Sequence, residues 1–165
     1  MQNTITTETS KPKPKIEIND QFKKAFALIE DESRHVYITG KAGTGKSTFL
    51  NFLRKNTRKN LVVLASTGVA AVNVRGQTIY SFFRFKPDIT VDAVSEIKFR
   101  GAKRKKMYKS LDVIVIDEIS MVRADLLDCI NAFLKIYGPD PELDFGGVQM
   151  IFIGDLFQLS PVVRR

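Results

Sequence analysis

The chain has 165 residues, 44% of them apolar, which is enough for one buried core and too few for two ordinary domains. No apolar run approaches the ~18 to 20 residues that cross a bilayer, and residues 1–16 lack a hydrophobic secretion signal, so the sequence argues against a membrane or secreted protein. The formal net charge of +8 would fall to +1 without the seven basic residues between Lys98 and Lys109, a run that contains no acid. This run could contact phosphate backbones or could be a solvated, mobile connector. The single cysteine, Cys129, cannot form an internal disulfide, which fits a reducing, intracellular compartment.

Helical and strand patterns alternate along the chain. Residues 1–15 are polar and alternate Lys with Pro, so we expect a disordered tail, followed by one ordered domain over residues 16–165. From a cap at Asn19 or Asp20, apolar residues at helical spacing predict an amphipathic helix to about Glu32. Apolar, β-branched runs predict buried parallel strands over residues 36–39, 61–65, 113–116 and 148–153, and residues 126–137 carry a helical period. This order predicts an α/β fold with a mainly parallel central sheet flanked by helices.

A glycine-rich segment follows the first predicted strand. Residues 40–47 read Gly-Lys-Ala-Gly-Thr-Gly-Lys-Ser, which fits the phosphate-loop pattern G-x-x-x-x-G-K-[ST] between a strand and a helix. Glycines let successive N–H groups turn inward toward phosphate oxygens at a helix N-terminus. Lys46 would reach the β- and γ-phosphates of ATP, and the Ser47 hydroxyl would bind Mg²⁺. The candidate nucleotide-binding residues of this segment are Gly40, Ala42, Gly43, Thr44, Gly45, Lys46, Ser47 and Thr48. The alternative is a glycine-rich turn that binds nothing.

Two further segments follow buried strands at the edge where open α/β folds place ligands. Asp117 and Glu118 end the strand at residues 113–116; Asp117 would hold Mg²⁺, and Glu118 would orient and deprotonate the attacking water. Alone, such a pair is often a solvated turn, but next to a phosphate loop it indicates hydrolysis. Gln158 follows the strand at residues 148–153, and its amide can donate and accept hydrogen bonds, so it could sense the γ-phosphate. An exposed glutamine in a turn before Pro161 is the alternative.

Together, four segments resemble the superfamily 1B DNA helicases of the petite integration frequency (Pif) type, relatives of RecD. These segments are residues 40–47, 66–83, 117–121 and 154–162, and the resemblance runs from about Asn19 to Val162. It implies a RecA-like P-loop NTPase fold and an ATP-dependent DNA helicase that translocates 5′ to 3′ on single-stranded DNA and unwinds duplexes. The family's roles lie in DNA repair, recombination, telomere and genome maintenance.

The resemblance also assigns candidate roles to individual residues. Gln21 stands at the position of the family's adenine-reading glutamine. Residues of the family's DNA-contact segments correspond here to Thr67, Gly68, Thr78, Tyr80, Ser81 and Phe82. For Phe82 and its neighbour Phe83, core packing is the alternative; because two adjacent residues rarely face the same way, the sequence does not decide between core packing and DNA contact.

The sequence also departs from the family pattern. Tyr80 replaces the usual histidine, which leaves an imidazole role in doubt, although a phenol can still stack and donate. Leu156 and Ser160 replace the common Phe and Pro, and Lys41 adds a charge within the loop. The sole histidine, His35, is expected to be structural, since no ligand cluster accompanies it.

The resemblance implies partners that the chain itself does not supply. The chain ends at Arg165, soon after the third motif, so a second RecA-like domain with catalytic arginines is expected to be missing. Alone, the fragment should bind nucleotide weakly, hydrolyse it very slowly and unwind nothing. We expect an intracellular monomer, cytoplasmic in bacteria or nuclear or mitochondrial in eukaryotes, that acts on single-stranded DNA and duplex junctions. The alternatives are a truncated nucleotide- or DNA-binding module that does not hydrolyse ATP and, less supported, a small-molecule kinase.

Overall fold

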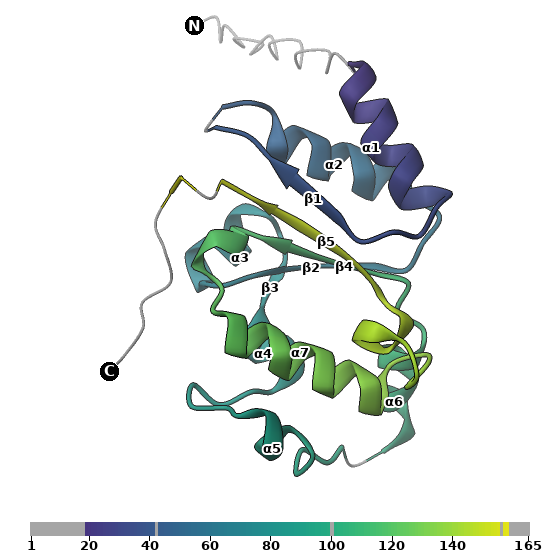
Figure 1. Cartoon of the computed structure of the whole chain (residues 1–165), viewed down its shortest axis with the longest axis vertical. Helices are drawn as coiled ribbons and strands as arrows, with labels where there is room; N and C mark the ends of the chain where they lie inside the picture. Colours follow the sequence, from purple (N-terminus) through teal and green to yellow (C-terminus); the bar gives the residue numbers. More distant parts are fainter. Residues whose placement is uncertain (1–18, 42, 100, 156, 159–165) are drawn as a thin grey trace, which may run out of the picture.

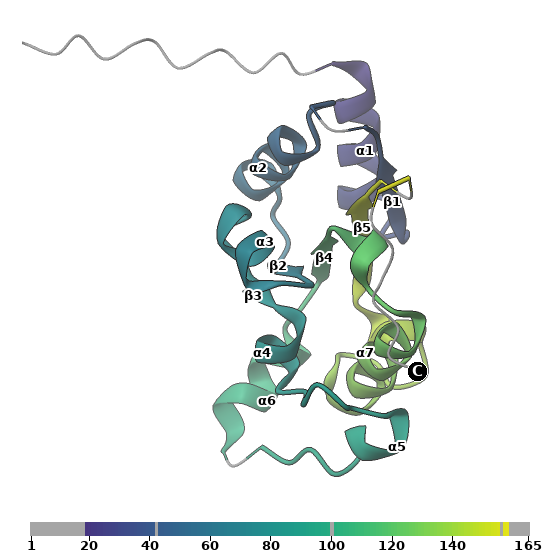
Figure 2. The same ribbon diagram turned by 90° about the vertical axis from the view of Figure 1, so that its left-hand side faces the viewer.

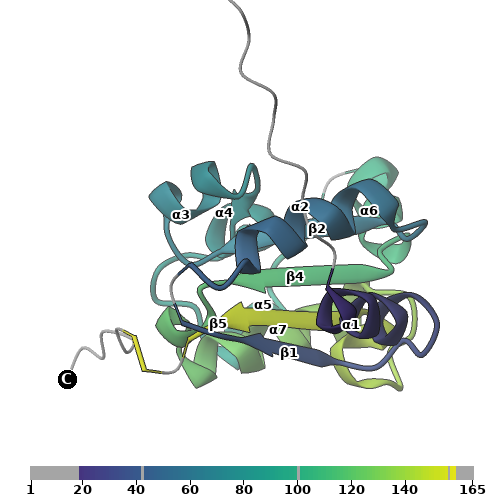
Figure 3. The same ribbon diagram turned by 90° about the horizontal axis from the view of Figure 1, so that it is seen from above.

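A five-stranded parallel sheet organises the chain. The computed structural model describes residues 19–41, 43–99, 101–155, 157 and 158, so the expected tail at residues 1–15 lies outside the described part. The strands are β1 (Val36–Thr39), β2 (Leu61–Ala65), β3 (Gln77–Thr78), β4 (Val113–Asp117) and β5 (Gln149–Gly154). They pair in parallel in the order β1-β5-β4-β2-β3, and Figure 3 shows β1, β4 and β5 pointing the same way.

Helices cover both faces of this sheet (Figures 1 and 2). On one face, α1 (Asp20–Glu30), α2 (Lys46–Asn56) and α3 (Gly68–Asn73) pack through one apolar cluster. On the other face, a larger cluster joins α4 (Ile79–Phe83), α5 (Val91–Val94), α6 (Ala102–Lys109) and α7 (Ala124–Tyr137). A short 3₁₀ helix, η1 (Ile119–Met121), precedes α7, and a turn with left-handed backbone at Phe145 and Gly146, η2 (Asp144–Gly147), precedes β5. Among the residues described, no helix combines the length and apolar character that crossing a bilayer requires.

The central strand β4 shows why the sequence folds into this sheet. Val113 and Val115 belong to the cluster under α1 and α2, whereas Ile114 and Ile116 belong to the cluster under α7, and all four are fully buried. Each such side chain stabilises the fold by roughly 1.5–3 kcal/mol relative to exposure. A strand buried on both faces needs an unbroken apolar run, which is the pattern the sequence shows.

Most predicted elements are confirmed, with small shifts at their ends. Helix α1 begins at its Asn19 cap, whose side chain accepts a hydrogen bond from Phe22 N at 2.9 Å, and it ends at Glu30 rather than about Glu32. The strand predicted over residues 148–153 spans Gln149–Gly154. The largest addition is in the basic run, for which the sequence left phosphate contact and a mobile connector open and which contains helix α6.

Candidate functional site

The glycine-rich loop joins β1 to α2 at the carboxyl edge of the sheet. Gly43 and Gly45 have φ of 80° and 95°, a backbone region that suits glycine and turns the loop back toward the helix. Gly45 caps α2 without a side-chain hydrogen bond, so the first N–H groups of the helix keep no side-chain acceptor. A helix N-terminus of this kind favours an anion. Ala42, predicted in the same loop, lies outside the described residues.

The Lys46 side chain folds back onto the backbone of the loop. Its Nζ donates to the carbonyl of Gly40 at 2.5 Å and to the carbonyl of Lys41 at 3.1 Å. The Thr44 hydroxyl also donates to the Lys41 carbonyl, at 2.8 Å. A Cβ on Gly40 would lie 2.5 Å from Thr44 Oγ1, so a larger residue at position 40 would displace the Thr44 hydroxyl. These contacts hold the Lys46 ammonium group against the glycine-rich turn.

The acidic pair lies at the end of β4. Burial, and secondarily the charge of Glu118, raises the pKa of Asp117 above its usual range, while the nearby Lys46 ammonium opposes this shift. Glu118 adopts φ of 53°, which is uncommon for a residue with a side chain and is typical of strained functional positions. Both carboxylates are half-buried. The electrostatic influence of Lys46 on Asp117 shows that the fold brings the loop and the acidic pair together.

Strand β5 lies between β1 and β4 and delivers the third predicted segment. Gln158 is exposed, and its N–H donates to the carbonyl of Asp155 at 3.0 Å. The Asp155 side chain is 6% exposed, and its Oδ1 accepts from Phe157 N at 3.1 Å. Sequence reasoning gave Asp155 no role, because its effect on the turn that carries Gln158 depends on backbone geometry. Leu156, Ser160 and Pro161, with the rest of residues 159–165, lie outside the described part of the chain.

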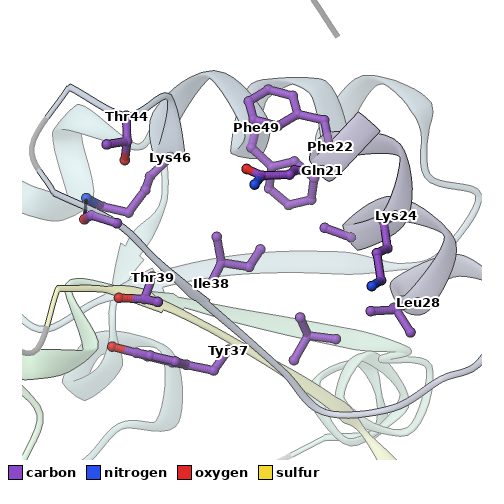
Figure 4. A pocket seen from close by; sticks show the side chains of 13 residues that line it. Gln21, Phe22, Lys24, Leu28, Tyr37, Ile38, Thr39, Thr44, Lys46 and Phe49 are labelled. Atoms are coloured by element: carbon purple, nitrogen blue, oxygen red, sulfur yellow. Dashed lines mark hydrogen bonds between the residues drawn. The ribbon is translucent and has the colours of Figure 1, made fainter. Parts of the chain in front are cut away.

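A cavity of about 530 Å³ extends from the loop toward α1 (Figure 4). Gln21 and Lys46 line it from α1 and α2, so two predicted nucleotide-binding residues from separate segments share one cavity. The Phe22 ring forms one wall and packs edge-on against Phe49 at 5.3 Å between centroids. Sequence reasoning treated Phe22 only as part of a helical period. Tyr37 of β1 also lines the cavity. The sequence did not identify it, because the side-chain pattern of a four-residue strand does not show which residues border a cavity at the edge of the sheet.

The predicted DNA-contact residues lie at the starts of α3 and α4. The hydroxyl of Thr67 accepts from Ala70 N at 3.2 Å, and that of Thr78 accepts from Ser81 N at 3.1 Å. Both threonines therefore cap helices, a role that by itself explains the residue type. Gly68 starts α3 in open space, with no neighbouring heavy atom within 4 Å of an added Cβ.

Two adjacent aromatic residues of α4 lie in the core. Phe82 is 6% exposed and Phe83 is fully buried, so both rings pack in the core. For Phe82, this burial favours the alternative of core packing over contact with DNA, because a buried ring has no face on which a base can stack. Tyr80 is half-buried and packs at the edge of the core, and Ser81 is exposed.

His35 and Cys129 lie away from the candidate site. His35 Nδ1 accepts from the backbone N–H of Met150 at 3.0 Å, and its ring packs edge-on against Phe145. Cys129 is buried within α7, and burial raises the pKa of its thiol. Neither side chain belongs to the loop, the acidic pair or the cavity.

The fold and this arrangement define the class of protein. A glycine-rich loop after the edge strand of a parallel sheet, with an acidic pair two strands away, is the architecture of a P-loop nucleotide-binding domain. The same arrangement places the third segment on the strand between them.

Comparisons with known proteins identify the family. A family model described as PIF1-like helicase matches residues 17–165. The ATP-dependent DNA helicase PIF1 of Saccharomyces cerevisiae (strain YJM789) is 37% identical over 149 residues, which cover 86% of this chain and 17% of the yeast protein. The ATP-dependent DNA helicase Pif1 of Psychrobacter sp. (strain PRwf-1) is 38% identical over 152 residues, covering 87% of this chain and 22% of the relative. The chain belongs to the PIF1-like helicase family and spans less than a quarter of the length of either relative.

Solved structures agree with this membership. A Pif1 helicase from Bacteroides, in complex with ADP-AlF3 and single-stranded DNA, superposes with a TM-score of 0.79 at 37% identity. The match covers 92% of this chain and 35% of that chain. The predicted RecA-like fold with a mainly parallel sheet is confirmed.

Proposed function

We propose that the chain is the ATP-binding motor domain of an ATP-dependent DNA helicase that moves 5′ to 3′ along single-stranded DNA and separates duplexes. One observation carries the proposal: β1, β5 and β4 are neighbouring parallel strands, and each leads into one of the three predicted segments. Strands lie ~4.8 Å apart, so the loop and the acidic pair are separated by about two strand spacings. A triphosphate with its cation can bridge such a distance.

The residues of the loop fit a nucleotide. Gly40 and residues 43–48 would hold the phosphates through N–H groups, and the Lys46 ammonium would leave the loop carbonyls for the β- and γ-phosphates. Ala42, outside the described residues, is part of the same proposal. Gln21 lines the same cavity beside Phe22 and Phe49, and its amide would pair there with the adenine edge (Figure 4). The edge-on rings of Phe22 and Phe49 would form an apolar wall beside the base.

Mg²⁺ fits the oxygen ligands at the loop and at β4. The Ser47 hydroxyl and the Asp117 carboxylate are hard oxygen donors, and a cation beside Asp117 would offset the burial that raises its pKa. When bound, the ion neutralises charge that develops on the phosphate oxygens. Glu118 would orient a water and accept its proton at a carboxylate oxygen. Its left-handed backbone directs the residue out of the line of β4.

The segment after β5 would couple the nucleotide to DNA. Gln158 lies in a turn whose backbone is hydrogen-bonded to Asp155. A change in the hydrogen bonds of the Gln158 side-chain amide would therefore move this turn. On the DNA side, we propose contacts from Thr67, Gly68, Thr78, Tyr80 and Ser81, with hydroxyls and N–H groups meeting phosphates and the Tyr80 ring meeting a base. Phe82 is left out because it is buried.

The motor would need a partner domain. An arginine supplied from outside to the transition state can raise the rate by ~10³ to 10⁵, so a second RecA-like domain is proposed to complete the site. The protein would work as a monomer inside the cell, on single-stranded DNA and duplex junctions, in DNA repair, recombination, and telomere and genome maintenance.

ATP hydrolysis with and without single-stranded DNA tests the proposal. The 165-residue chain should turn over slowly, and a longer form with a second RecA-like domain should be strongly stimulated by single-stranded DNA. Absence of stimulation in both forms, with nucleotide still bound, would instead support a binding module without turnover. Phosphoryl transfer to a small molecule would indicate a kinase.

A further inference from the structure

The basic run of the sequence forms an ordered helix. In α6, the side chains of Lys103, Lys105, Lys106 and Lys109 are exposed. Figure 2 shows α6 below α4, and Figure 3 shows it toward the amino ends of the strands, away from the edge where the nucleotide loop lies. Arg100, which precedes the helix, lies outside the described residues. The lysines of α6 therefore form a surface separate from the nucleotide site, which we call the α6 surface.

The helix is fixed to the core through its opposite side. Tyr108 is fully buried, and its hydroxyl donates to the carbonyl of Phe82 at 2.6 Å, which links α6 to α4. Burial raises the pKa of Tyr108, so the hydroxyl remains a donor. Arg104 lies 5.7 Å above the ring of Phe99, where a cation–π contact holds it. With this face anchored, the helix presents the four lysines to solvent.

The α6 surface concentrates charge without compensation. Within the described residues, none of its four lysines forms an ion pair, and the helix itself contains no acid. Lys103 with Lys106, and Lys105 with Lys109, are neighbours one turn apart, and like-charge pairs at this spacing destabilise a helix. Lys103 also lies in the first turn, where the helix dipole disfavours a cation. A negatively charged partner would offset both the repulsion between the lysines and the unfavourable helix dipole at Lys103.

The chemistry of the surface favours a phosphate backbone over bases. The nearby rings of Phe99 and Tyr108 are buried, and the one large apolar side chain exposed on the helix is Met107, so the described part of this face offers no ring for base stacking. Single-strand binding relies on such rings, whereas a duplex presents only phosphates and groove edges to a lysine face. Eight residues of helix span about 12 Å, along which a duplex carries about seven phosphate charges.

We propose that the α6 surface binds the phosphate backbone of double-stranded DNA, at a place distinct from the single-strand contacts at α3 and α4. The inference rests on the proposed function, since it takes DNA as the substrate. It adds a duplex contact whose affinity comes from counterion release and does not depend on base sequence. Such a contact would hold the duplex beside the motor while one strand is moved.

A pair of matched double variants tests the proposal. Lys103→Gln with Lys106→Gln removes two charges from the α6 surface, and Lys23→Gln with Lys55→Gln removes two exposed charges from α1 and α2, at the other end of the molecule (Figure 1). Affinity for a duplex of about 20 base pairs is measured between about 50 and 200 mM salt, and the slope of log K against log salt should become shallower by about 1.8, or 0.9 per lost phosphate contact, in the α6 variant. The control should change by less than half of this. Thermal unfolding of the α6 variant should be unchanged or slightly higher, because a like-charge pair is removed.

Other outcomes separate this proposal from the proposed function. An α6 variant with the same slope as the control, in a chain that still binds an ATP analogue and single-stranded DNA, overturns the α6 proposal and leaves the motor intact. Lost binding to phosphatidylserine vesicles with an unchanged duplex slope overturns it in favour of a membrane surface. A wild-type chain that binds no DNA at any salt concentration overturns both.

Discussion

Asp155 should act as a positioning residue for Gln158, and its removal gives a sharp test of the coupling segment. Asp155→Ala deletes the Oδ1 acceptor of the 3.1 Å hydrogen bond from Phe157 N, which shapes the turn that holds Gln158. A hydrogen bond to a charged acceptor is worth about 1.5–3 kcal/mol, and about 1.4 kcal/mol corresponds to a tenfold change in rate. If the whole of this energy serves to place Gln158, kcat for DNA-stimulated ATP hydrolysis should fall by about 10- to 100-fold.

The matched variant is Asp155→Asn, which keeps an oxygen acceptor while it removes the charge. Steady-state kinetics in a form with a second RecA-like domain should give a smaller loss of kcat for Asn than for Ala, because Asn keeps a neutral acceptor. KM for ATP should change little in both, since the loop and the cavity are intact. Equal losses for the two variants would show that the charge of Asp155, rather than its hydrogen bond, matters. A raised KM with normal kcat would refute the positioning role, because the residue would then serve binding.

Three further predictions follow from single residues. Gly45→Ala should weaken binding of an ATP analogue about tenfold in a titration, because φ of 95° costs a residue with Cβ about 1–2 kcal/mol; an unchanged affinity would contradict the loop conformation. Asp117→Asn should raise the free energy of unfolding in urea at neutral pH, because burial raises the pKa of Asp117 and so disfavours its ionised form in the folded state. The gain should disappear below the ordinary pKa of 3.8, where Asp117 is protonated in both the folded and the unfolded state. A lower free energy of unfolding for Asp117→Asn at neutral pH would contradict the direction of this pKa shift. Tyr108→Phe should lower the melting temperature by several degrees, since the Phe82 carbonyl loses a buried donor worth about 1–3 kcal/mol, whereas Tyr37→Phe, at a 42% exposed side chain, should leave it within about a degree; equal melting temperatures for the two variants would contradict the α6–α4 link.

Local patterns predicted the sheet and the loop because both depend on short-range physics. A short, β-branched apolar run such as residues 113–116 favours a strand buried on both faces, and the glycines at positions 43 and 45 adopt the positive φ that their spacing suggests. Asp117 and Glu118 were predicted at a strand end for the same reason, since a run that stops in two acids leaves the core there. Their approach to Lys46 follows from strand order, which the chain alone did not specify.

Features that depend on tertiary packing were missed. Helix α6 lacks an apolar period, and its order comes from Tyr108, which reaches the carbonyl of Phe82 across 26 positions of sequence. Phe82 was assigned to DNA through the family resemblance, with core packing as the alternative, and in the five-residue helix α4 both it and Phe83 pack against core neighbours. Asp155 carries no motif of its own, so only the turn geometry reveals its hydrogen bond to Phe157.

Binding of a triphosphate by the glycine-rich loop is the central claim. The most direct test compares the affinity for Mg-ATP of the wild-type chain and of Lys46→Ala. A fluorescent ATP analogue titrated in the presence of Mg²⁺ should bind at least tenfold more weakly to Lys46→Ala, since a charge-assisted hydrogen bond to phosphate is worth about 1.5–3 kcal/mol. Lys55→Ala, at the far end of the same helix, should bind as the wild type does. Equal affinity of Lys46→Ala and Lys55→Ala, or a wild-type chain that binds no Mg-ATP even at millimolar concentration, would contradict the assignment of the loop and of the motor.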